Sequence, residues 1–327
     1  MDIIDVVDLR KYFPVKTGPF TKQGALKAVD GVSISIRQGK VFSLVGESGC
    51  GKSTVARLVL RLMKPTGGDI LFKGSRVSEL EGESLRAFRK SVQIIFQDPF
   101  ASLNPRMTVI DTLSEPLKIH KIVPKKEIKE KVVSLLKSVG LQADVLDRYP
   151  HEFSGGQRQR ICIARALAVS PEVIVADEPL SALDVSIQAQ VLNILQDLKK
   201  ESNISFLFIS HDLRVVQYFS DEVGVMYLGK IVENAKAEDL FDNPLHPYTV
   251  VLLSSAPKIR PDGQKRTILK GDVPSPIDIP GGCPFHPRCS KRFDPCDKVV
   301  PKLEAPIGHG FSGRLVSCHL WNPYREY

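Results

Sequence analysis

The sequence lacks any apolar run long enough to cross a membrane. Its longest runs, such as Val173–Ala176 and Phe206–Ile209, have the length of a strand, whereas a membrane-spanning helix needs about 20 residues. The N-terminal segment Met1–Asp5 carries acidic side chains, where a secretory signal carries basic ones. We therefore expect a soluble protein that only a partner could hold at a membrane.

The sequence also lacks blocks of like charge, internal repeats and low-complexity tracts. The formal net charge is +8, which would permit an anionic neighbour. However, the lysines and arginines are spread along the chain, and no basic stripe is interleaved with aromatic residues as in single-strand binders. We therefore expect no nucleic acid partner.

Cysteines are few and unevenly placed. Cys50 and Cys162 stand alone in the first half, and the other four lie near the C-terminus: Cys283, Cys289, Cys296 and Cys318. A secreted disulfide framework would be shorter and denser. Four clustered cysteines in an intracellular chain indicate a metal site instead.

Strand-like and helix-like segments alternate from about Val32 to Val232, which predicts an α/β domain with a mostly parallel sheet. The stretch Ala28–Ile36 alternates in polarity and predicts a peripheral antiparallel layer. Buried strands read as continuous apolar runs, and five segments do so: Val41–Val45, Val92–Phe96, Val173–Ala176, Phe206–Ile209 and Gly224–Tyr227.

Two regions depart from this alternation. Apolar residues recur at helical spacing over Lys118–Gly140, which predicts a helical insertion in the α/β core, at about residues 99–158. After about Leu253 prolines become frequent, which excludes long helices. We therefore expect one domain over residues 1–255 and a loop-rich, metal-binding C-terminal extension over residues 256–327.

A glycine-rich segment matches the phosphate-binding pattern G-x-x-x-x-G-K-[ST], with a strand before it and a helix after it. Its glycines allow backbone N–H groups to surround a phosphate at a helix N-terminus. Lys52 would reach the β- and γ-phosphates, and the Ser53 hydroxyl would bind Mg²⁺. Cys50 is expected to be a small filler. The residues of this loop are Gly46, Glu47, Ser48, Gly49, Cys50, Gly51, Lys52, Ser53 and Thr54.

The run Val173–Ala176 is followed by two carboxylates, Asp177 and Glu178. They emerge at the C-terminal end of a buried strand, where open parallel sheets place their ligands. Asp177 would hold Mg²⁺, and Glu178 would act as general base on the attacking water.

A second phosphate-type segment consists of Ser154, Gly155, Gly156 and Gln157, followed by a predicted helix over Ile161–Val169. Ser154 would cap this helix, and the two glycines would expose further N–H donors. Because one nucleotide has a single γ-phosphate, two such helix N-termini predict a head-to-tail dimer. Each ATP would then lie between the P-loop of one subunit and the Ser-Gly-Gly segment of the other.

These motifs together resemble the ABC transporter nucleotide-binding domain, with Phe153 where leucine is commoner. The resemblance implies an ATPase with a P-loop NTPase (RecA-like) α/β core, an antiparallel β subdomain and a helical subdomain. It implies roles for Gln97 in sensing Mg²⁺ and water, for Asp184 in the D-loop Ser181–Asp184, and for His211 as the switch histidine on the γ-phosphate. It also implies an aromatic residue stacked on adenine; Phe13 is preferred to Tyr12 by spacing.

The chain further resembles the ATPases of oligopeptide and dipeptide importers, and the F-type more than the D-type subunit. This resemblance rests on Leu183–Gln190, Asn243–Thr249, Pro274–Ile277 and Cys283–Cys289. It implies a D-type ATPase partner or a homodimer, two transmembrane permeases, an external peptide-binding protein and a peripheral place on the cytoplasmic face of the membrane. The alternatives are a related nickel or oligosaccharide importer and a soluble, non-transport ABC ATPase.

The four C-terminal cysteines are spaced C-x5-C-x6-C-x21-C, unlike the C-x2-C pairs of a zinc ribbon. Four thiolates can bind a [4Fe–4S] cluster, and the resemblance implies such a cluster in a structural role. A mixed-ligand zinc site that includes His286 and His319 is the alternative. Free buried cysteines are a third.

Overall fold

The computed structural model describes residues 1–15, 24–254, 274–308 and 311–322. They fall into two compact units. The first comprises Met1–Ile3, Ile36–Val41 and Glu79–Ser210, and the second comprises Ile4–Ser35, Phe42–Ser78 and His211–Tyr327. Among the described residues, none of the helices has the length and hydropathy needed to cross a bilayer.

The first unit contains three neighbouring parallel strands: β6 (Val92–Ile95), β7 (Val173–Asp177) and β8 (Ser205–Ile209). Strand β7 lies between the other two, with Ile174 opposite Gln93 and Phe206. All residues of β7 and β8 are buried, as expected for strands covered on both faces. The predicted strands are confirmed to within one residue at each end.

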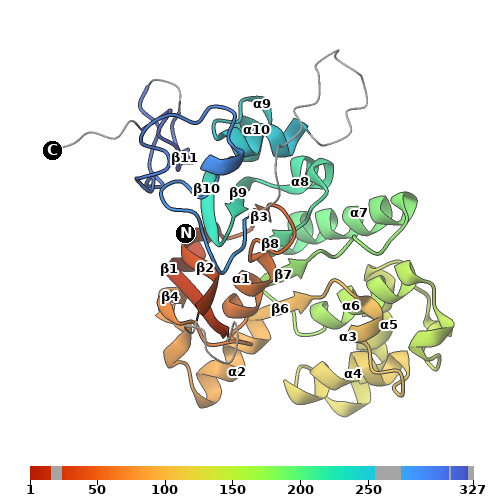
Figure 1. Ribbon diagram of the computed structural model, residues 1–327. Coiled ribbons are helices and arrows are strands. Elements are labelled where there is room, and N and C mark those ends of the chain that lie inside the picture. The colour runs from red at the N-terminus through yellow and green to blue at the C-terminus, as the bar shows by residue number, and fades with distance from the viewer. Residues whose placement is uncertain (16–23, 255–273, 309–310, 323–327) are drawn as a thin grey trace. The chain divides into compact units, whose positions relative to one another are not determined.

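The helices of this unit surround α6 (Gly155–Leu167), which α3 (Pro99–Ser102), α4 (Val109–Ile119), α5 (Ile128–Ser138) and α7 (Val185–Ser202) all contact (Figure 1). Most of the side chains that they bury are apolar, as amphipathic helices of a shared core require. Helix α2 (Gly82–Ser91) precedes β6. The short helical turns of this unit are η2 (Lys125–Glu127), η3 (Ala143–Val145) and η4 (Pro150–Glu152), and η1 (Val77–Glu79) enters it only with Glu79.

The helical stretch predicted over Lys118–Gly140 is interrupted in the structure. Helix α4 ends at Ile119, and α5 begins only at Ile128. Between them Lys121 adopts a φ of +49°, and Pro124 precedes η2. Proline has no N–H to donate and disfavours a helical residue before it, so the apolar periodicity continues while the helix does not.

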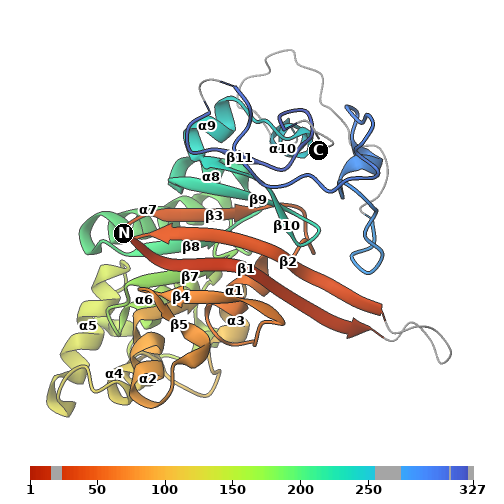
Figure 2. The ribbon, with the colours of Figure 1, turned by 90° about the vertical axis from the view of Figure 1, so that its left-hand side faces the viewer.

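The second unit contains a four-stranded sheet in the order β2-β1-β4-β5 (Figure 2). Its members are β1 (Asp2–Val15), β2 (Gly24–Arg37), β4 (Gly67–Phe72) and β5 (Ser75–Arg76). Strands β1 and β4 are antiparallel, with Ile4 opposite Phe72. From Val29 to Ile36, buried and more exposed residues of β2 largely alternate, as in a sheet with one face in the core. The predicted antiparallel layer is confirmed.

The same unit contains strand β3 (Val41–Val45), which is parallel to β9 (Glu222–Tyr227); β10 (Lys230–Lys236) follows antiparallel to β9, and β11 (Leu315–Val316) antiparallel to β10. Its helices are α1 (Lys52–Val59), α8 (Leu213–Phe219), α9 (Ala237–Asp242) and α10 (Pro247–Ser254). The strand predicted over Gly224–Tyr227 is confirmed and begins two residues earlier.

The C-terminal region, residues 274–308 and 311–322, packs on the rest of this unit through β11 and a buried ion pair. The Glu233 carboxylate, on β10, is 2.9 Å from the Arg314 guanidinium and accepts the backbone N–H groups of Leu245 and His246. Trp321 donates its indole N–H to the carbonyl of Leu245. Within residues 274–308 and 311–322 the only helical turn is η5 (His286–Arg288), so long helices are absent there, as predicted. The predicted boundary at 255–256 lies outside the described residues.

Candidate functional site

The phosphate-binding loop, residues 46–54, connects β3 to α1. Gly51 caps α1 with a φ of +112°, and a Cβ there would lie 2.0 Å from the carbonyl oxygen of Ala28. A Cβ on Gly46 would lie 2.1 Å from the carbonyl oxygen of Met226. Neighbouring backbone therefore restricts both positions to glycine, and the loop keeps the tight path that a phosphate cradle requires.

Lys52 lies buried at the first position of α1, and its ammonium turns back over the loop. Its Nζ donates to the carbonyl oxygens of Gly46 (2.9 Å) and Glu47 (3.0 Å). Cys50 is also buried, and burial raises the pKa of its thiol. Ser48 and Gly49 form the exposed tip of the loop, while Ser53 and Thr54 lie half-buried in the first turn of α1. The loop thus combines one cation with exposed backbone at a helix N-terminus.

Two residues from outside the loop hold Glu47. Its backbone N–H donates to the Tyr248 hydroxyl at 2.9 Å. Its carboxylate accepts both terminal nitrogens of Arg288, at 2.9 and 3.1 Å, and this hydrogen bonding raises the pKa of the arginine further. Arg288 also lies 3.5 Å from the Tyr227 hydroxyl. Residues of α10 and of the C-terminal region therefore fix the second residue of the phosphate-binding loop.

Asp177 and Glu178 stand at the end of β7, as predicted. Asp177 is buried, whereas Glu178 is half-buried and adopts a left-handed φ of +47°. Such a conformation is strained for a residue with a Cβ and is often found at functional sites. Gln97, which follows β6, donates its amide to the Glu178 carboxylate at 2.9 Å. The first unit therefore brings together three predicted residues: Gln97, Asp177 and Glu178.

Ser154 caps α6, because its hydroxyl accepts the N–H of Gln157 while the Gln157 side chain accepts the N–H of Ser154. Helix α6 thus begins at Gly155, six residues before the predicted helix. Ser154, Gly155 and Gln157 are exposed, whereas Gly156 is buried against Ile187, whose Cγ2 would lie 2.3 Å from an added Cβ.

The exposed N-terminus of α6, at Gly155, is suited to an anion. Asp184, from the same unit, is the exposed N-cap residue of the next helix, α7.

His211 and Phe13 belong to the second unit. His211 is exposed just before α8. Phe13 is half-buried on β1, and the ammonium of Lys11 lies 5.2 Å from the centroid of its ring. The alternative aromatic residue, Tyr12, donates its hydroxyl to Asp30. Burial, together with that contact, raises the pKa of Tyr12 to about 12.

One pocket in the second unit is lined by all four C-terminal cysteines, with three histidines beside them: His246, His286 and His319. Burial raises the pKa of Cys283 to about 12 and that of Cys318 to about 11. His286 Nδ1 lies 3.0 Å from the carbonyl of Cys283, and His319 Nε2 lies 2.9 Å from that of Val299. In the described parts of the chain, no three His, Cys, Asp or Glu side chains are arranged to hold a metal ion.

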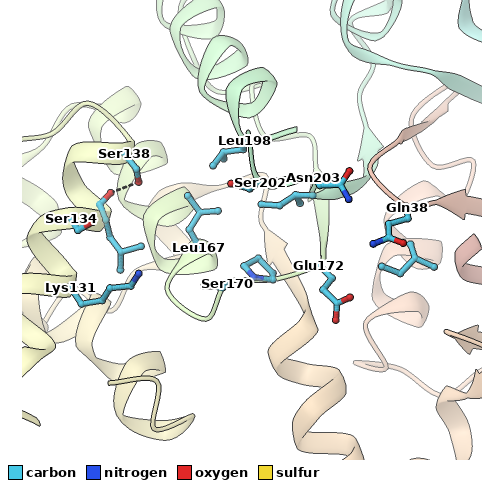
Figure 3. A pocket seen from close by; sticks show the side chains of 14 residues that line it. Gln38, Lys131, Ser134, Ser138, Leu167, Ser170, Glu172, Leu198, Ser202 and Asn203 are labelled. Atoms are coloured by element: carbon cyan, nitrogen blue, oxygen red, sulfur yellow. Dashed lines mark hydrogen bonds between the residues drawn. The ribbon is translucent and has the colours of Figure 1, made fainter. Parts of the chain in front are cut away.

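A larger cavity of about 400 Å³ lies in the first unit, between the C-terminal ends of α5 and α7 (Figure 3). Lys131 and Ser134 border it from α5, and Leu198 borders it from α7; Glu172 and Asn203 also line it. None of the predicted site residues lines this cavity, so the sequence motifs and this cavity mark different places.

Sequence reasoning did not single out Glu47, Arg288 or Tyr248 as functional residues. Arg288 and Tyr248 do occur in the segments Cys283–Cys289 and Asn243–Thr249, which were used only as marks of resemblance. The one signal in the sequence for Arg288 is that it is a charged residue between two of the clustered cysteines. Its partner lies 241 positions away, and no local pattern identifies it.

Comparison with known proteins agrees with this architecture. A family model described as "ABC transporter" matches residues 29–181. The dimeric structure of the ATP-binding cassette MJ0796 bound to ADP and Pi is 26% identical, with a TM-score of 0.64, over 72% of this chain and 98% of that one. CbiO1 from Clostridium perfringens is 27% identical, with a TM-score of 0.63, over 76% and 93%. Fold and loops define the class: the chain is an ATP-hydrolysing ABC cassette.

The relatives narrow the class further. A second family model, "Oligopeptide/dipeptide transporter, C-terminal region", matches residues 232–296 and so begins within β10. The oligopeptide transport ATP-binding protein AppF of Bacillus subtilis is 53% identical over 98% of both chains. The dipeptide transport ATP-binding protein DppF of Escherichia coli is 47% identical over 97% of this chain and 93% of its own. The chain belongs to the family of oligopeptide and dipeptide transport ATP-binding proteins.

Proposed function

We propose that this chain energises the import of oligopeptides or dipeptides across the cytoplasmic membrane by hydrolysing ATP. The observation that carries the proposal is the phosphate-binding loop, in which neighbouring backbone restricts Gly46 and Gly51 to glycine while Lys52 spans the loop. Similarity to peptide-transport subunits extends over 98% of the chain. Residues 1–255 act as the cassette, with a helical subdomain at about 99–158, and residues 256–327 form the extension.

The loop fits the phosphates of ATP by its chemistry. Exposed N–H groups at Ser48 and Gly49, and those at the start of α1, provide donors, and the Lys52 ammonium provides the positive charge. Cys50 fills the space beneath the loop. Ser53 and Thr54 carry hydroxyls in the first turn, where Ser53 binds Mg²⁺.

Mg²⁺ would neutralise charge on the phosphates. Ser53, Asp177 and Gln97 provide oxygen donors of the type that this ion prefers. Glu178 orients the attacking water and accepts its proton, and the bond from Gln97 fixes the carboxylate for that task. His211 hydrogen-bonds the γ-phosphate, and Phe13 stacks on the adenine.

The segment Ser154–Gln157 acts on the nucleotide of a partner subunit. Ser154, Gly155 and Gln157 are exposed at the capped N-terminus of α6, and a helix N-terminus suits a second set of phosphate contacts. Asp184 lines the same dimer interface. The partner is a D-type ATPase or a second copy of this chain, and the pair works on the cytoplasmic face beneath two permeases supplied by an external peptide-binding protein.

The four C-terminal cysteines are proposed to hold a [4Fe–4S] cluster with a structural role. Their thiols line a single pocket, and a set of thiol donors selects zinc or an iron–sulfur cluster. The pocket also contains a buried His319 Nδ1 without a hydrogen-bond partner. A cluster held by Cys283, Cys289, Cys296 and Cys318 would join the two described segments of a proline-rich region, residues 274–308 and 311–322, which have little secondary structure of their own.

Metal analysis of protein purified without air tests this proposal. We expect brown protein with iron and acid-labile sulfide in equal amounts, and loss of both in Cys289→Ser. Cys162→Ser, which removes a thiol of the first unit, serves as the control and should retain them. Colourless protein with stoichiometric zinc would show that the site binds zinc instead of an iron–sulfur cluster. Protein without any metal would exclude both kinds of site.

Affinity purification of the tagged chain from detergent-solubilised membranes tests the transport function. We expect two permeases and a second ATPase subunit to co-purify. We further expect that, after reconstitution, peptide-loaded binding protein stimulates ATP hydrolysis. A chain that hydrolyses ATP without any membrane partner would favour the soluble alternative, and stimulation by nickel or an oligosaccharide instead of peptide would assign a related importer.

A further inference from the structure

The phosphate-binding loop is tied to the C-terminal region by a chain of polar contacts. Arg288, on η5, forms a two-pronged ion pair with the Glu47 carboxylate, at 2.9 and 3.1 Å. Its side chain is only 7% exposed and that of Glu47 is 25% exposed. Pairs that are this well aligned and shielded from water are stronger than ordinary surface pairs.

The contacts continue from Glu47 to the lysine of the loop. The Glu47 carbonyl accepts the Lys52 ammonium at 3.0 Å and the N–H of Cys50 at 3.3 Å, while its own N–H donates to Tyr248. Glu47 therefore has its carboxylate and its N–H fixed from outside the loop, and its carbonyl fixed inside. Any movement of its backbone changes the position of Lys52.

The two residues that hold Glu47 from outside the loop, Arg288 and Tyr248, are supported by a buried aromatic cluster. Tyr227, Tyr248 and Phe285 are fully buried, and their ring centroids are 4.7 to 5.4 Å apart. Phe285 immediately precedes η5, which carries Arg288. The aromatic packing thus fixes both residues that hold Glu47.

We propose that Arg288 and Tyr248 are positioning residues of the phosphate-binding loop, through which the C-terminal region and α10 set the affinity for nucleotide. The inference rests on the proposed role of residues 46–54 in binding ATP phosphates. Arg288 and Tyr248 act through Glu47 and need not touch the nucleotide. Because Cys283 and Cys289 flank η5, the segment that lines the cysteine pocket is the same one that holds the loop.

The test measures the Kd of the full-length protein for MgADP, and the KM and kcat for ATP in the assembled transporter. Arg288→Met should weaken nucleotide binding and raise KM about threefold to tenfold, the equivalent of one charge-assisted pair, with kcat within about twofold. Arg288→Lys keeps the charge but not the two-pronged geometry, so it should fall between Arg288→Met and the unmutated protein. Arg292→Met breaks an exposed pair with Asp297 in the same segment and should have no effect.

Two further variants keep the proposal falsifiable if Arg288→Met does not fold. Tyr248→Phe preserves the ring packing and removes only the acceptor of the Glu47 N–H, and it should also raise Kd. The double variant Glu47→Gln/Arg288→Lys should raise the Kd for MgADP no more than the more severe of the two single variants does. An unchanged Kd in both Arg288→Lys and Tyr248→Phe overturns the proposal.

Lys52→Ala distinguishes failure of this inference from failure of the proposed function. If Lys52→Ala abolishes MgADP binding while the Arg288 and Tyr248 variants bind normally, the loop binds nucleotide but is not positioned by the C-terminal region. If Lys52→Ala binds MgADP as tightly as the unmutated protein, residues 46–54 do not bind nucleotide phosphates, and the proposed function itself fails.

Discussion

The side-chain amide of Gln97 donates a hydrogen bond to the carboxylate of Glu178, with 2.9 Å between Nε2 and Oε2. The two residues follow neighbouring parallel strands, β6 and β7, and the bond fixes a side chain whose own backbone is strained, at a φ of +47°. The position of the proposed general base therefore depends on the residue that is proposed to sense Mg²⁺.

Gln97→Ala should slow ATP hydrolysis about tenfold, because a hydrogen bond to a charged group contributes enough to change a barrier by that factor. The affinity for ADP without Mg²⁺ should remain unchanged, since the phosphate-binding loop keeps its own contacts. Single-turnover hydrolysis and titration with ADP in the absence of Mg²⁺ measure the two effects separately. Gln93→Ala, which removes an amide of β6 that is bonded to the carbonyl of Arg89 in α2, is the matched control. Equal rates of hydrolysis in the two variants would contradict the role of Gln97.

Gly51→Ala should abolish nucleotide binding and strongly destabilise the protein. The added Cβ meets the Ala28 carbonyl at 2.0 Å in a backbone conformation that disfavours side chains. Gly74→Ala is the matched control, because Gly74 has a φ of +80° but open space around it. It should cost only about 1 kcal/mol, the penalty for the left-handed conformation alone. Urea unfolding measures the stability of both variants. A similar loss of unfolding free energy in Gly51→Ala and Gly74→Ala would contradict the steric argument.

Arg314→Met should destabilise the protein by about 3–5 kcal/mol, because it leaves the fully buried Glu233 carboxylate without its cation. Restoring neutrality in Glu233→Gln/Arg314→Met should recover part of this loss. Arg148→Met breaks an exposed ion pair with Asp144 and should change the free energy of unfolding by no more than about 1 kcal/mol. Chemical denaturation of the three variants gives the comparison; a loss in Arg314→Met as small as that in Arg148→Met would show that the pair does not hold the C-terminal region.

Asp30 should contribute stability that depends on pH. Burial by itself would raise the pKa of this carboxyl, but hydrogen bonds from Tyr12 and Lys230 outweigh burial and hold it below its ordinary value of 3.8. The unfolded chain therefore takes up a proton at a pH where the native protein does not, so stability falls as pH drops through 3.8 toward the lower native pKa.

Tyr12→Phe, which removes one of these hydrogen bonds, tests the effect. Its melting temperature should lie below that of the unmutated protein by a constant amount between about pH 5 and 7, and the difference should shrink below about pH 4. Tyr218→Phe, an exposed tyrosine, should show no difference at any pH. A difference for Tyr12→Phe that does not vary with pH would exclude the coupling to Asp30.

Much of the cassette could be predicted from the sequence, because its signals are local. The strands covered on both faces are continuous apolar runs, and the phosphate-binding loop carries its own pattern between a strand and a helix. Ser154 was predicted as a cap because a capping residue and its helix are adjacent in sequence. Apolar periodicity did not locate the break at Pro124, since the two sides of the break bury similar faces.

Contacts between distant residues could not be predicted in the same way. Gln97 and Glu178 are 81 positions apart, and Glu47 and Arg288 are 241 positions apart. The first pair depends on the order of the strands, and the second depends on the packing of the C-terminal region. No local pattern encodes either of them. The cysteine spacing pointed to a common site, but only the fold shows that the four thiols line one pocket.

The most direct test of the account is ATP turnover and nucleotide trapping by Glu178→Gln. This substitution keeps the size of the side chain and its contact with Gln97 while it removes the proposed base. In the assembled transporter we expect hydrolysis to fall about 100-fold or more, with ATP retained in a closed ATPase pair that can be isolated by gel filtration. Hydrolysis at the unmutated rate, or the absence of any trapped ATP, would contradict the assignment of Glu178 and with it the proposed hydrolytic site.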